Sequence, residues 1–364
     1  MFGLFKKKGP FTATIKPAGK SITVESKSSE NLLKAALDNG IQWPHNCRVG
    51  SCGTCRCKLL DGDIKPLNDF GYVLTEAEMD DGYILACQTM LKSDVEIEVD
   101  LDGHAGAETE GIVFAKPRKV KGIITRISPL THDIVEVGVE LEGKFSDYLP
   151  GQYADVTVPG AVKQPRSYSF SRSPANEKPN HVSFIIRRVP DGEFTEWLHA
   201  EDRVGQGIEL DGPHGSFYLR KTDGPLVFVA GGSGLSSIRA LCQQYVEEGL
   251  KNDCTLIFGA RTQKDLYCLE DIEEIAAKAK GRVDFVPCLS EEKDKDSWEG
   301  ATGNCPDVIT KTMLDKKSSH AYLCGPPVMV DVAMERLKKL GLHESRIFFD
   351  KFLDASTMPS ARGR

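Results

Sequence analysis

Four cysteines with a characteristic spacing constrain the fold of this chain more than any other feature. They are Cys47, Cys52, Cys55 and Cys87. Four residues separate the first two, two residues separate the second and third, and the fourth follows at a distance, which is the spacing of thiolates that hold a [2Fe–2S] cluster. Gly50 and Gly53 lie in the same loop and can adopt a positive φ, which turns backbone N–H groups toward an anionic centre. The sequence therefore predicts an iron–sulfur cluster that carries one electron at a time.

A structural zinc site, in a scaffold without catalytic activity, is the alternative for these cysteines. Zinc ribbons need two Cys-x-x-Cys pairs, whereas this region contains only one, formed by Cys52 and Cys55. The spacing therefore favours iron. Cys57 lies two residues beyond Cys55, on the strand expected next, and we interpret it as a packed cysteine rather than as a fifth ligand.

The composition is that of a globular protein large enough for two or three domains. The 364 residues carry a formal net charge of −7, which argues against nucleic acid as a partner because no basic surface is available to neutralise phosphates. The odd number of cysteines, 11, and the lack of an N-terminal apolar signal favour a reducing cytoplasm. No apolar run approaches the roughly 18 residues that span a bilayer.

The first eight residues combine large apolar side chains with three lysines. Such a segment, Met1–Lys8, is able to contact an anionic membrane surface and would then place the protein at the inner membrane as a peripheral component. Chain ends of this length more often have no such role. Both interpretations stay open at this point.

Hydrophobic patterning divides the remainder into three domains. Residues 11–102 alternate short strands with a helix around the cysteine loop, which indicates an α+β fold. Residues 103–115, rich in Gly, Ala and Glu, are expected to form a linker. Short β-rich runs separated by turns over residues 116–221 predict an antiparallel β-barrel. Residues 222–352 alternate apolar strands with helices, which predicts an α/β domain with helices on both faces of a parallel sheet.

Two segments of the predicted barrel have the chemistry of a flavin site. Arg166 offers a guanidinium for a pyrophosphate, Tyr168 an aromatic face for an isoalloxazine ring, and Ser169 a hydroxyl near its N5 atom. Gly192 and Thr195 stand where a helix is expected to begin, and its free N–H groups are suited to the same pyrophosphate. An ordinary strand and a helix-entry turn are the alternatives.

The parallel-sheet domain contains a glycine turn suited to a dinucleotide. Gly231, Gly232 and Gly234 lie between a buried strand and a helix, at the edge where parallel sheets bind phosphates, although they do not form the G-x-G-x-x-G fingerprint. Cys324 follows another strand at the same edge and is expected beside the crevice; a buried, inert cysteine is the alternative. Nicotinamide gives up a hydride whereas a cluster takes single electrons, so a flavin between the two connects all three sites.

These motifs, in this order, resemble those of the reductase components of bacterial multicomponent oxygenases, and in particular the electron-transfer components of xylene-type monooxygenases. The stretches that carry the resemblance are Pro44–Cys47, Pro150–Val156, Arg166–Ser171, Phe258–Arg261, Asp265–Leu269 and Tyr322–Asp331. The resemblance implies a ferredoxin reductase-like architecture: a β-grasp [2Fe–2S] ferredoxin domain, an antiparallel β-barrel that binds FAD, and an α/β domain that binds NAD.

The same resemblance implies a function. NADH is the expected donor, FAD and the [2Fe–2S] cluster are the expected carriers, and the terminal hydroxylase of a monooxygenase, a non-haem di-iron enzyme that in the xylene type is bound to the membrane, is the expected acceptor. A Rieske dioxygenase or a soluble di-iron monooxygenase is the alternative acceptor. A reductase that acts directly on a small organic substrate is a further alternative.

The resemblance also assigns roles to matching positions. The positions that it places at FAD or NADH are Arg166, Tyr168, Ser169, Gly192, Thr195, Gly231, Gly232, Gly234, Arg261 and Phe352. The positions that it places at the site of hydride transfer are Ser169, Cys324 and Asp350. Arg261 is able to meet a 2′-phosphate, but Asp265 nearby would repel one, which favours NADH over NADPH.

Three places depart from the pattern of these reductases. The stretch Gly192–Thr195 follows the pattern only in its glycine and its hydroxyl. Ser236 and Ser237 follow the glycine turn where relatives commonly have Ala-Pro, and Asp350 stands where relatives often have glutamate. The aspartate side chain is one methylene shorter, so it reaches less far toward a flavin.

Overall fold

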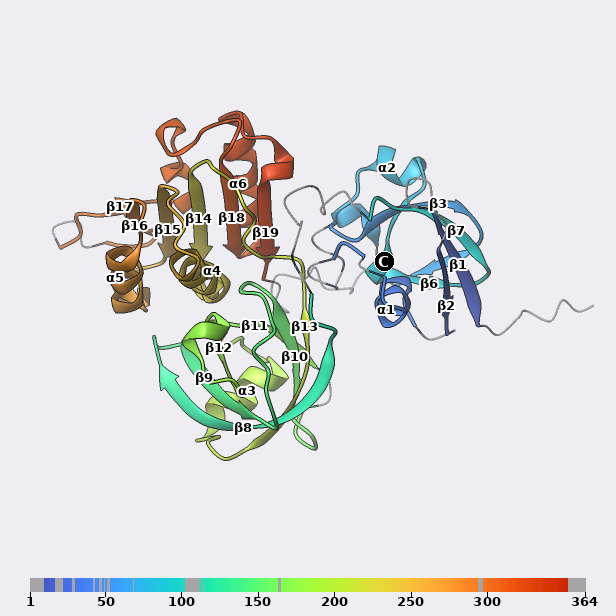
Figure 1. The fold of residues 1–364 in the computed structure, drawn as a ribbon, viewed down its shortest axis with the longest axis horizontal. Coiled ribbons are helices and arrows are strands. Elements are labelled where there is room, and N and C mark those ends of the chain that lie inside the picture. The colour runs from blue at the N-terminus through green and yellow to red at the C-terminus, as the bar shows by residue number, and fades with distance from the viewer. Residues whose placement is uncertain are drawn as a thin grey trace, which may run out of the picture. The chain divides into compact units, whose positions relative to one another are not determined.

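The structure of the protein is a computed structural model (Figure 1). It describes residues 10–16, 22–27, 30–41, 43–45, 48, 50, 53–67, 69–101, 112, 114–162, 165–293 and 297–352. The chain divides into two compact units, Met1–Glu110 and Gly111–Arg364. No helix in these described ranges has the length and apolar character needed to cross a membrane.

The first unit is built on a mixed five-stranded sheet with the strand order β2-β1-β7-β3-β5. Its strands are β1 (Phe11–Lys16), β2 (Ile22–Ser26), β3 (Arg56–Asp61), β5 (Tyr83–Leu85) and β7 (Val95–Glu98), with a separate ribbon of β4 (Ile64–Pro66) and β6 (Thr89–Leu91). Its helices are α1 (Leu32–Asp38) and α2 (Glu76–Asp80). Strands β1 and β7 pair in parallel, and the remaining neighbours are antiparallel.

The sequence explains why helix α1 forms, because it supplies a capping residue, an apolar face and a residue that ends the helix. The Asn31 side chain accepts the backbone N–H of Lys34 at 2.8 Å and so caps the first turn. Leu33 and Ala36 are buried in the core of this unit. Gly40, with φ of 79°, then leads the chain out of the helix.

The second unit begins with a six-stranded antiparallel sheet that curves into a near-barrel (Figure 1). Its strands are β8 (Arg118–Pro129), β9 (Ile134–Leu141), β10 (Tyr153–Thr157), β11 (Arg166–Ser169), β12 (His181–Arg187) and β13 (Gly207–His214), and its helix is α3 (Glu193–Ala200). The order β11-β10-β13-β8-β9-β12 closes through a bridge between Phe170 and Phe184. The rings of Tyr148 and Phe170 stack inside at 4.0 Å, which fills the interior with aromatic side chains.

The rest of the second unit is a six-stranded parallel sheet. Its strands are β14 (Leu226–Gly231), β15 (Cys254–Ala260), β16 (Val283–Leu289), β17 (Ala301–Thr302), β18 (His320–Gly325) and β19 (Ile347–Lys351). Its helices are α4 (Leu235–Glu247), α5 (Leu269–Lys278) and α6 (Pro327–Lys339). The strand order is β17-β16-β15-β14-β18-β19, and every neighbouring pair is parallel.

Helices cover both faces of this sheet, as the sequence predicts. Along β14, Phe228 packs into one core and Val229 into the other, because successive side chains of a strand point to opposite faces. Apolar residues of α4 and α5 belong to the first core, and those of α6 belong to the second. The carboxyl ends of the parallel strands are therefore left open between the helix layers, where a dinucleotide is expected.

Candidate functional site

Two of the four predicted cluster ligands lie in the described residues, and the fold of the first unit brings them together. Cys55 precedes β3, Cys87 lies in the short 3-10 turn Ala86–Gln88, and both are buried. The backbone N–H of Cys87 donates to the Sγ atom of Cys55 at 3.5 Å, the kind of contact that stabilises a thiolate ligand. The other two predicted ligands, Cys47 and Cys52, lie outside the described residues.

The backbone around these cysteines fits an anionic cluster. Gly50 and Gly53 have φ of 81° and 72°, so the prediction of a positive φ at both is confirmed. Cys57 lies on β3, where its thiol donates to the carbonyl of Ile84 at 3.8 Å. Burial, and to a smaller extent the neighbouring Cys87, raises the pKa of the Cys57 thiol, which favours a neutral packed cysteine.

Strand β11 of the near-barrel runs from the surface into the interior. Arg166 at its start is exposed, Tyr168 is partly exposed, and Ser169 at its end is buried. The ring of Tyr168 packs against Phe194 at 5.1 Å, and burial raises the pKa of its phenol, which stays protonated. A guanidinium at the exposed end and a hydroxyl at the buried end fit a flavin dinucleotide that lies along the strand.

Gly192 caps the start of α3, Thr195 lies in the first turn of that helix, and their main contacts are local. The Thr195 hydroxyl accepts the backbone N–H of Val189 and lies 3.1 Å from the Val189 carbonyl. A Cβ atom on Gly192 would approach the Oγ1 atom of Thr195 to 2.6 Å, so this turn needs a glycine. The two residues therefore shape the entrance of α3, and contact with FAD stays a prediction for both.

The three residues predicted at the site of hydride transfer meet in the second unit. The Oγ atom of Ser169 lies 3.5 Å from the Oδ2 atom of Asp350, which belongs to β19. Cys324 pairs with Asp350 across β18 and β19, and all three side chains are buried. Burial, with a further contribution from Asp350, raises the pKa of the Cys324 thiol, so it is neutral. Phe352 follows, and its backbone N–H donates to the carbonyl of Gly325 at 2.8 Å.

The glycines at the end of β14 and just after it pack against the end of β18 and the start of α6. A Cβ atom on Gly234 would lie 2.2 Å from the carbonyl oxygen of Cys324, and one on Gly231 would lie 2.4 Å from the sulfur of Met329. Gly232 adopts φ of 52°, in the left-handed region. The lack of side chains at Gly231 and Gly234 therefore lets the start of α4 lie directly against the end of β18 and the start of α6.

A pocket of about 510 Å³ opens at this edge. Residues that line it include Gly231, Gly232, Arg261 and Pro326 from the parallel-sheet domain and Asp133 and Arg187 from the near-barrel. Its size suits part of a dinucleotide, and its position at the carboxyl ends of parallel strands is the expected one.

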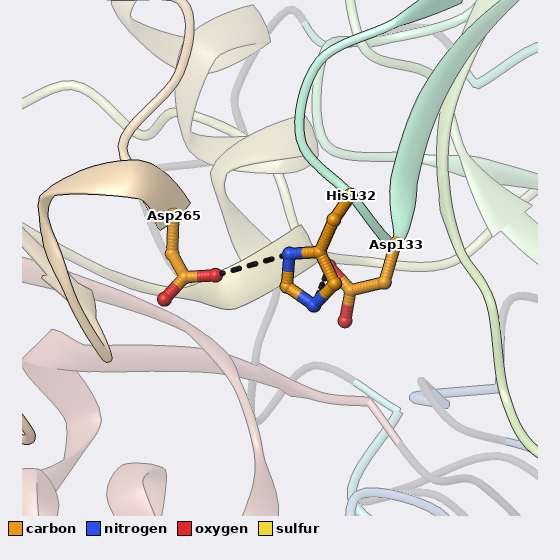
Figure 2. Close-up of side chains that lie close together, drawn as sticks. All are labelled: His132, Asp133 and Asp265. Carbon is orange, nitrogen blue, oxygen red and sulfur yellow. Dashed lines mark ion pairs between the residues drawn. The ribbon is translucent and has the colours of Figure 1, made fainter.

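Charges balance one another at the rim of this pocket. The Nη2 atom of Arg261 lies 3.3 Å from Asp133 and 3.4 Å from Asp265. Figure 2 shows the His132 ring between the same two carboxylates, at 3.8 Å and 3.6 Å. The positive charge of Arg261 is therefore already paired with Asp133 and Asp265. These two carboxylates would repel the negatively charged 2′-phosphate of NADPH, which favours NADH.

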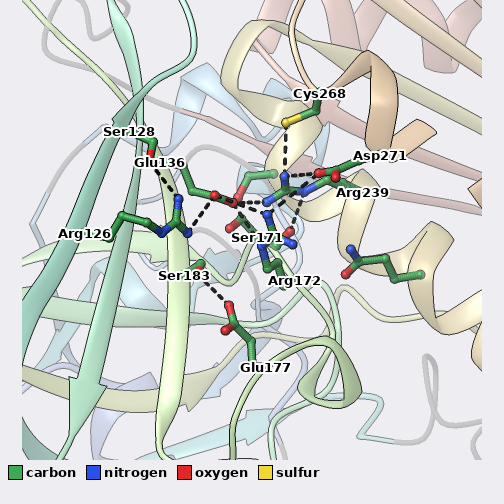
Figure 3. A network of polar contacts seen from close by, with 12 residues as sticks. Arg126, Ser128, Glu136, Ser171, Arg172, Glu177, Ser183, Arg239, Cys268 and Asp271 are labelled. Carbon is green, nitrogen blue, oxygen red and sulfur yellow. Dashed lines mark hydrogen bonds and ion pairs between the residues drawn. The ribbon is translucent and has the colours of Figure 1, made fainter. Parts of the chain in front are cut away.

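Sequence reasoning missed a buried ionic network between the near-barrel and the parallel-sheet domain. Figure 3 shows three guanidinium groups around Glu136 of β9, those of Arg126, Arg172 and Arg239. Burial alone would raise the pKa of Glu136, but the attraction of Arg239 and then of Arg172 outweighs it and lowers that pKa to about 2. A signal was available, because Glu136 interrupts an apolar run in its strand.

Substitution of Gly234 by alanine is expected to raise the KM for NADH and to lower the stability of the second unit by about 1–3 kcal/mol, since the new Cβ would overlap the Cys324 carbonyl. Steady-state kinetics with ferricyanide as acceptor, together with thermal unfolding, measure both effects. Gly207→Ala is the control, because that position has open space around it. Equal behaviour of the two variants would show that the turn tolerates a side chain.

Comparison with known proteins identifies the three domains. Family models match an iron–sulfur cluster binding domain of the 2Fe-2S type at residues 15–92, an oxidoreductase FAD-binding domain at 121–218 and an oxidoreductase NAD-binding domain at 228–335. The predicted cofactors, a [2Fe–2S] cluster, FAD and NAD, are confirmed at this level.

Relatives and solved structures cover almost the whole chain. The electron transfer component of a xylene/toluene monooxygenase from Pseudomonas putida is 38% identical, over 94% of each chain. The reductase component of a propane 2-monooxygenase from Rhodococcus jostii is 35% identical, over 91% of this chain and 89% of its own. A reductase component of a naphthalene 1,2-dioxygenase system from Pseudomonas putida is 34% identical, over 88% of this chain and 93% of its own.

The crystal structure of an Amycolatopsis cytochrome P450 reductase superposes with a TM-score of 0.77 at 28% identity, over 94% of this chain and 98% of the other. The predicted ferredoxin reductase-like fold is thereby confirmed, and the domains fit electron transfer from NADH through FAD to a [2Fe–2S] cluster. A reductase component implies a partner terminal oxygenase. The chain therefore belongs to the family of oxygenase reductase components in which an iron–sulfur domain, an FAD-binding domain and an NAD-binding domain are fused.

Proposed function

We propose that this chain supplies electrons from NADH to the terminal hydroxylase of a monooxygenase for alkyl-aromatic hydrocarbons, with a non-haem di-iron centre in that hydroxylase. The observation that supports this choice of acceptor is the 38% identity, over 94% of both chains, to the xylene/toluene monooxygenase component. When bound, FAD accepts two electrons as a hydride, and the cluster takes them one at a time.

We assign the flavin to strand β11 and the turn before α3. Arg166 binds the pyrophosphate, Tyr168 covers the isoalloxazine ring, and Ser169 lies at its reacting edge. Gly192 and Thr195 present the start of α3 to the pyrophosphate. The graded burial along β11, from exposed Arg166 to buried Ser169, supports this orientation.

We assign NADH to the pocket beside the glycine turn. Gly231, Gly232 and Gly234 allow the pyrophosphate to approach the backbone, as open sheet edges do for phosphates, and Arg261 faces the adenosine half at the rim. Cys324 lies beside the nicotinamide as a neutral thiol, so it shapes the site and does not act as a nucleophile.

Two residues complete the hydride-transfer site. Asp350 holds a hydrogen bond with Ser169 from the opposite domain, and Phe352 borders the flavin. The cluster ligands in the first unit are Cys47, Cys52, Cys55 and Cys87; of these, the contact between Cys55 and Cys87 supports the assignment.

The acceptor is tested by reconstitution with purified hydroxylases. With NADH and toluene, the full chain is expected to support product formation by the hydroxylase of a xylene-type monooxygenase. This rate is expected to be at least about tenfold higher than the rate that the chain supports with a naphthalene dioxygenase and its own substrate. The reason is that a partner with a matching docking surface binds more favourably by a few kcal/mol than one without it. The reverse order would transfer the proposal to a Rieske dioxygenase. Steady NADH oxidation with a small organic substrate and no protein acceptor would indicate a direct reductase.

A version of this reconstitution with membrane vesicles tests peripheral membrane contact through Met1–Lys8, residues that lie outside the described part of the chain. With the hydroxylase in vesicles that contain anionic lipid, a variant that lacks residues 1–8 is expected to need a higher concentration for half-maximal coupling, because the three lysines are lost. Equal concentrations for both forms would remove the membrane role of this segment.

A further inference from the structure

Helix α4 carries a stripe of polar residues on one face. The members of this polar stripe are Ser236, Arg239, Gln243 and Glu247. Their spacing of three, four and four residues keeps them on the same side of an α-helix. Residues between them, such as Ile238 and Leu241, pack into the core of the parallel-sheet domain instead. The helix therefore presents one apolar face to its own sheet and one polar face to something else.

The polar stripe binds the end of β11 and the segment that follows it, Ser169–Ser173. The Ser236 hydroxyl donates to the carbonyl of Ser169 at 3.1 Å, and the Nε atom of Arg239 donates to the carbonyl of Ser171 at 2.9 Å. The backbone N–H of Ser173 then donates to the Oε1 atom of Gln243 at 2.9 Å. The backbone of every second residue of the segment is therefore bound, at Ser169, Ser171 and Ser173.

The contacts follow helix and segment in the same order. Ser236, Arg239 and Gln243 along the helix meet Ser169, Ser171 and Ser173 along the segment. The serine, arginine and glutamine side chains of these contacts are buried, so water does not compete for the bonds. The contact is therefore a continuous run of hydrogen bonds between two elements of different domains.

The two elements lead to the two cofactor sites. Helix α4 begins directly after the glycine turn assigned to NADH, and the segment begins at Ser169, assigned to the reacting edge of the flavin. Ser236 stands two residues after Gly234 and bonds to the backbone of Ser169 itself. It is thus the member of the stripe nearest to both sites.

We propose that Ser236 is a positioning residue for hydride transfer: its hydrogen bond to the Ser169 carbonyl fixes the distance between the NADH turn and the flavin strand. This inference rests on the proposed sites of FAD and NADH. Hydride transfer needs the reacting atoms about 3–3.5 Å apart, and a misplacement of about 1 Å can cost about a hundredfold in rate. One bond at the junction of the two sites is therefore able to control the rate without contact to either cofactor.

The test compares Ser236→Ala with Gln243→Ala in the full chain loaded with FAD and cluster. Both substitutions remove one side-chain contact with the same segment, but Gln243 lies two helical turns farther from the glycine turn. Ser236→Ala is expected to slow flavin reduction at saturating NADH by about tenfold, measured by anaerobic rapid mixing. Gln243→Ala is expected to lower the melting temperature and to leave that rate within about twofold of the unchanged protein.

A second readout is independent of turnover. Titration of the oxidised protein with tetrahydro-NAD, which cannot give a hydride, produces long-wavelength charge-transfer absorbance only when nicotinamide and flavin rings stack. Ser236→Ala is expected to weaken this absorbance at saturation, and Ser236→Thr, which keeps the hydroxyl, is expected to restore it. An unchanged absorbance and rate in Ser236→Ala, or an equal loss in Gln243→Ala, would overturn the inference. Failure of NADH to reduce the flavin of the unchanged protein would instead overturn the proposed function.

Discussion

Replacement of Cys55 by serine is expected to abolish cluster assembly and, with it, the reduction of cytochrome c by NADH. Cys55 is buried and its sulfur accepts the N–H of Cys87, so a serine oxygen at this point would leave the iron with a hard, poorly suited ligand. Reduction of ferricyanide through FAD is expected to survive, because FAD and NADH bind in a separate compact unit. The visible spectrum, the iron content and the two acceptor assays measure these results.

Cys57→Ala is the matched control for this prediction. Cys57 is also buried and lies only two residues away, but its thiol contacts the Ile84 carbonyl. This variant is expected to keep its iron and its cytochrome c activity at some cost in stability. Retention of a full cluster by Cys55→Ser, or its loss in Cys57→Ala alone, would contradict the ligand assignment. Zinc in place of iron in the unchanged protein would contradict the cluster itself.

Replacement of Glu136 by glutamine is expected to destabilise the second unit by about 3 kcal/mol at pH 7. Three arginines converge on this carboxylate, and Arg239 among them is almost fully buried. Without the negative charge, Arg172 and Arg239 still pair with Asp271, but all three guanidinium groups lose the carboxylate on which they converge. Removal of one partner from a buried ion pair typically costs about 3–5 kcal/mol. Urea unfolding, monitored by the fluorescence of the released flavin, measures the loss of unfolding free energy.

The pH dependence of stability follows from the same carboxylate. Its pKa is lowered from 4.5 to about 2 in the folded protein, a difference worth about 3 kcal/mol. A depressed folded pKa means that this contribution is complete above the unfolded pKa and is lost as the pH falls from about 4.5 toward 2. The stability difference between the unchanged protein and Glu136→Gln is therefore expected to shrink to about 1 kcal/mol near pH 3.

Glu196→Gln is the control for this second prediction. Glu196 also pairs with an arginine, Arg188, at 2.7 Å, but on the exposed surface of α3. Exposed pairs contribute little, so this substitution is expected to change the unfolding midpoint hardly at all at any pH. A similar loss in both variants, or a loss in Glu136→Gln that does not depend on pH, would show that the network does not act through the charge of Glu136.

The parallel-sheet domain was largely predictable from the sequence because each of its elements has a local signal. The continuous apolar run Leu226–Ala230 lies in β14, and the helix that follows it, α4, has apolar residues at helical spacing. Helix α6 begins with Pro327 and is followed by Gly341, the residue types that typically mark the two ends of a helix. Local patterns of this kind depend on the sequence within one element, so a single sequence is enough to read them.

Contacts between elements were much less predictable. The bond between Ser236 and Ser169, and the pairing of Arg239 with Glu136, join residues about 70 and 100 positions apart in the chain. No periodicity marks such pairs, because they depend on how the near-barrel packs against α4. Thr195 illustrates the same limit: its contact with FAD stays a prediction, and no motif indicated that its hydroxyl bonds with the backbone of Val189. The motifs predicted the three cofactor-binding domains, which the family models confirm, but the contacts between these domains required the structure.

The polar stripe of α4 also sets a rule for building chimeric reductases. A nicotinamide domain transplanted from a relative would bring its own α4, whose polar residues match the flavin domain of that relative and not this one. The junction at residues 219–225, which looks like a natural place to join two halves, would then separate Ser236 and Arg239 from the serines and the glutamate that they bind. Working hybrids would therefore have to exchange α4 together with the segment Ser169–Ser173 and Glu136, as one inherited module.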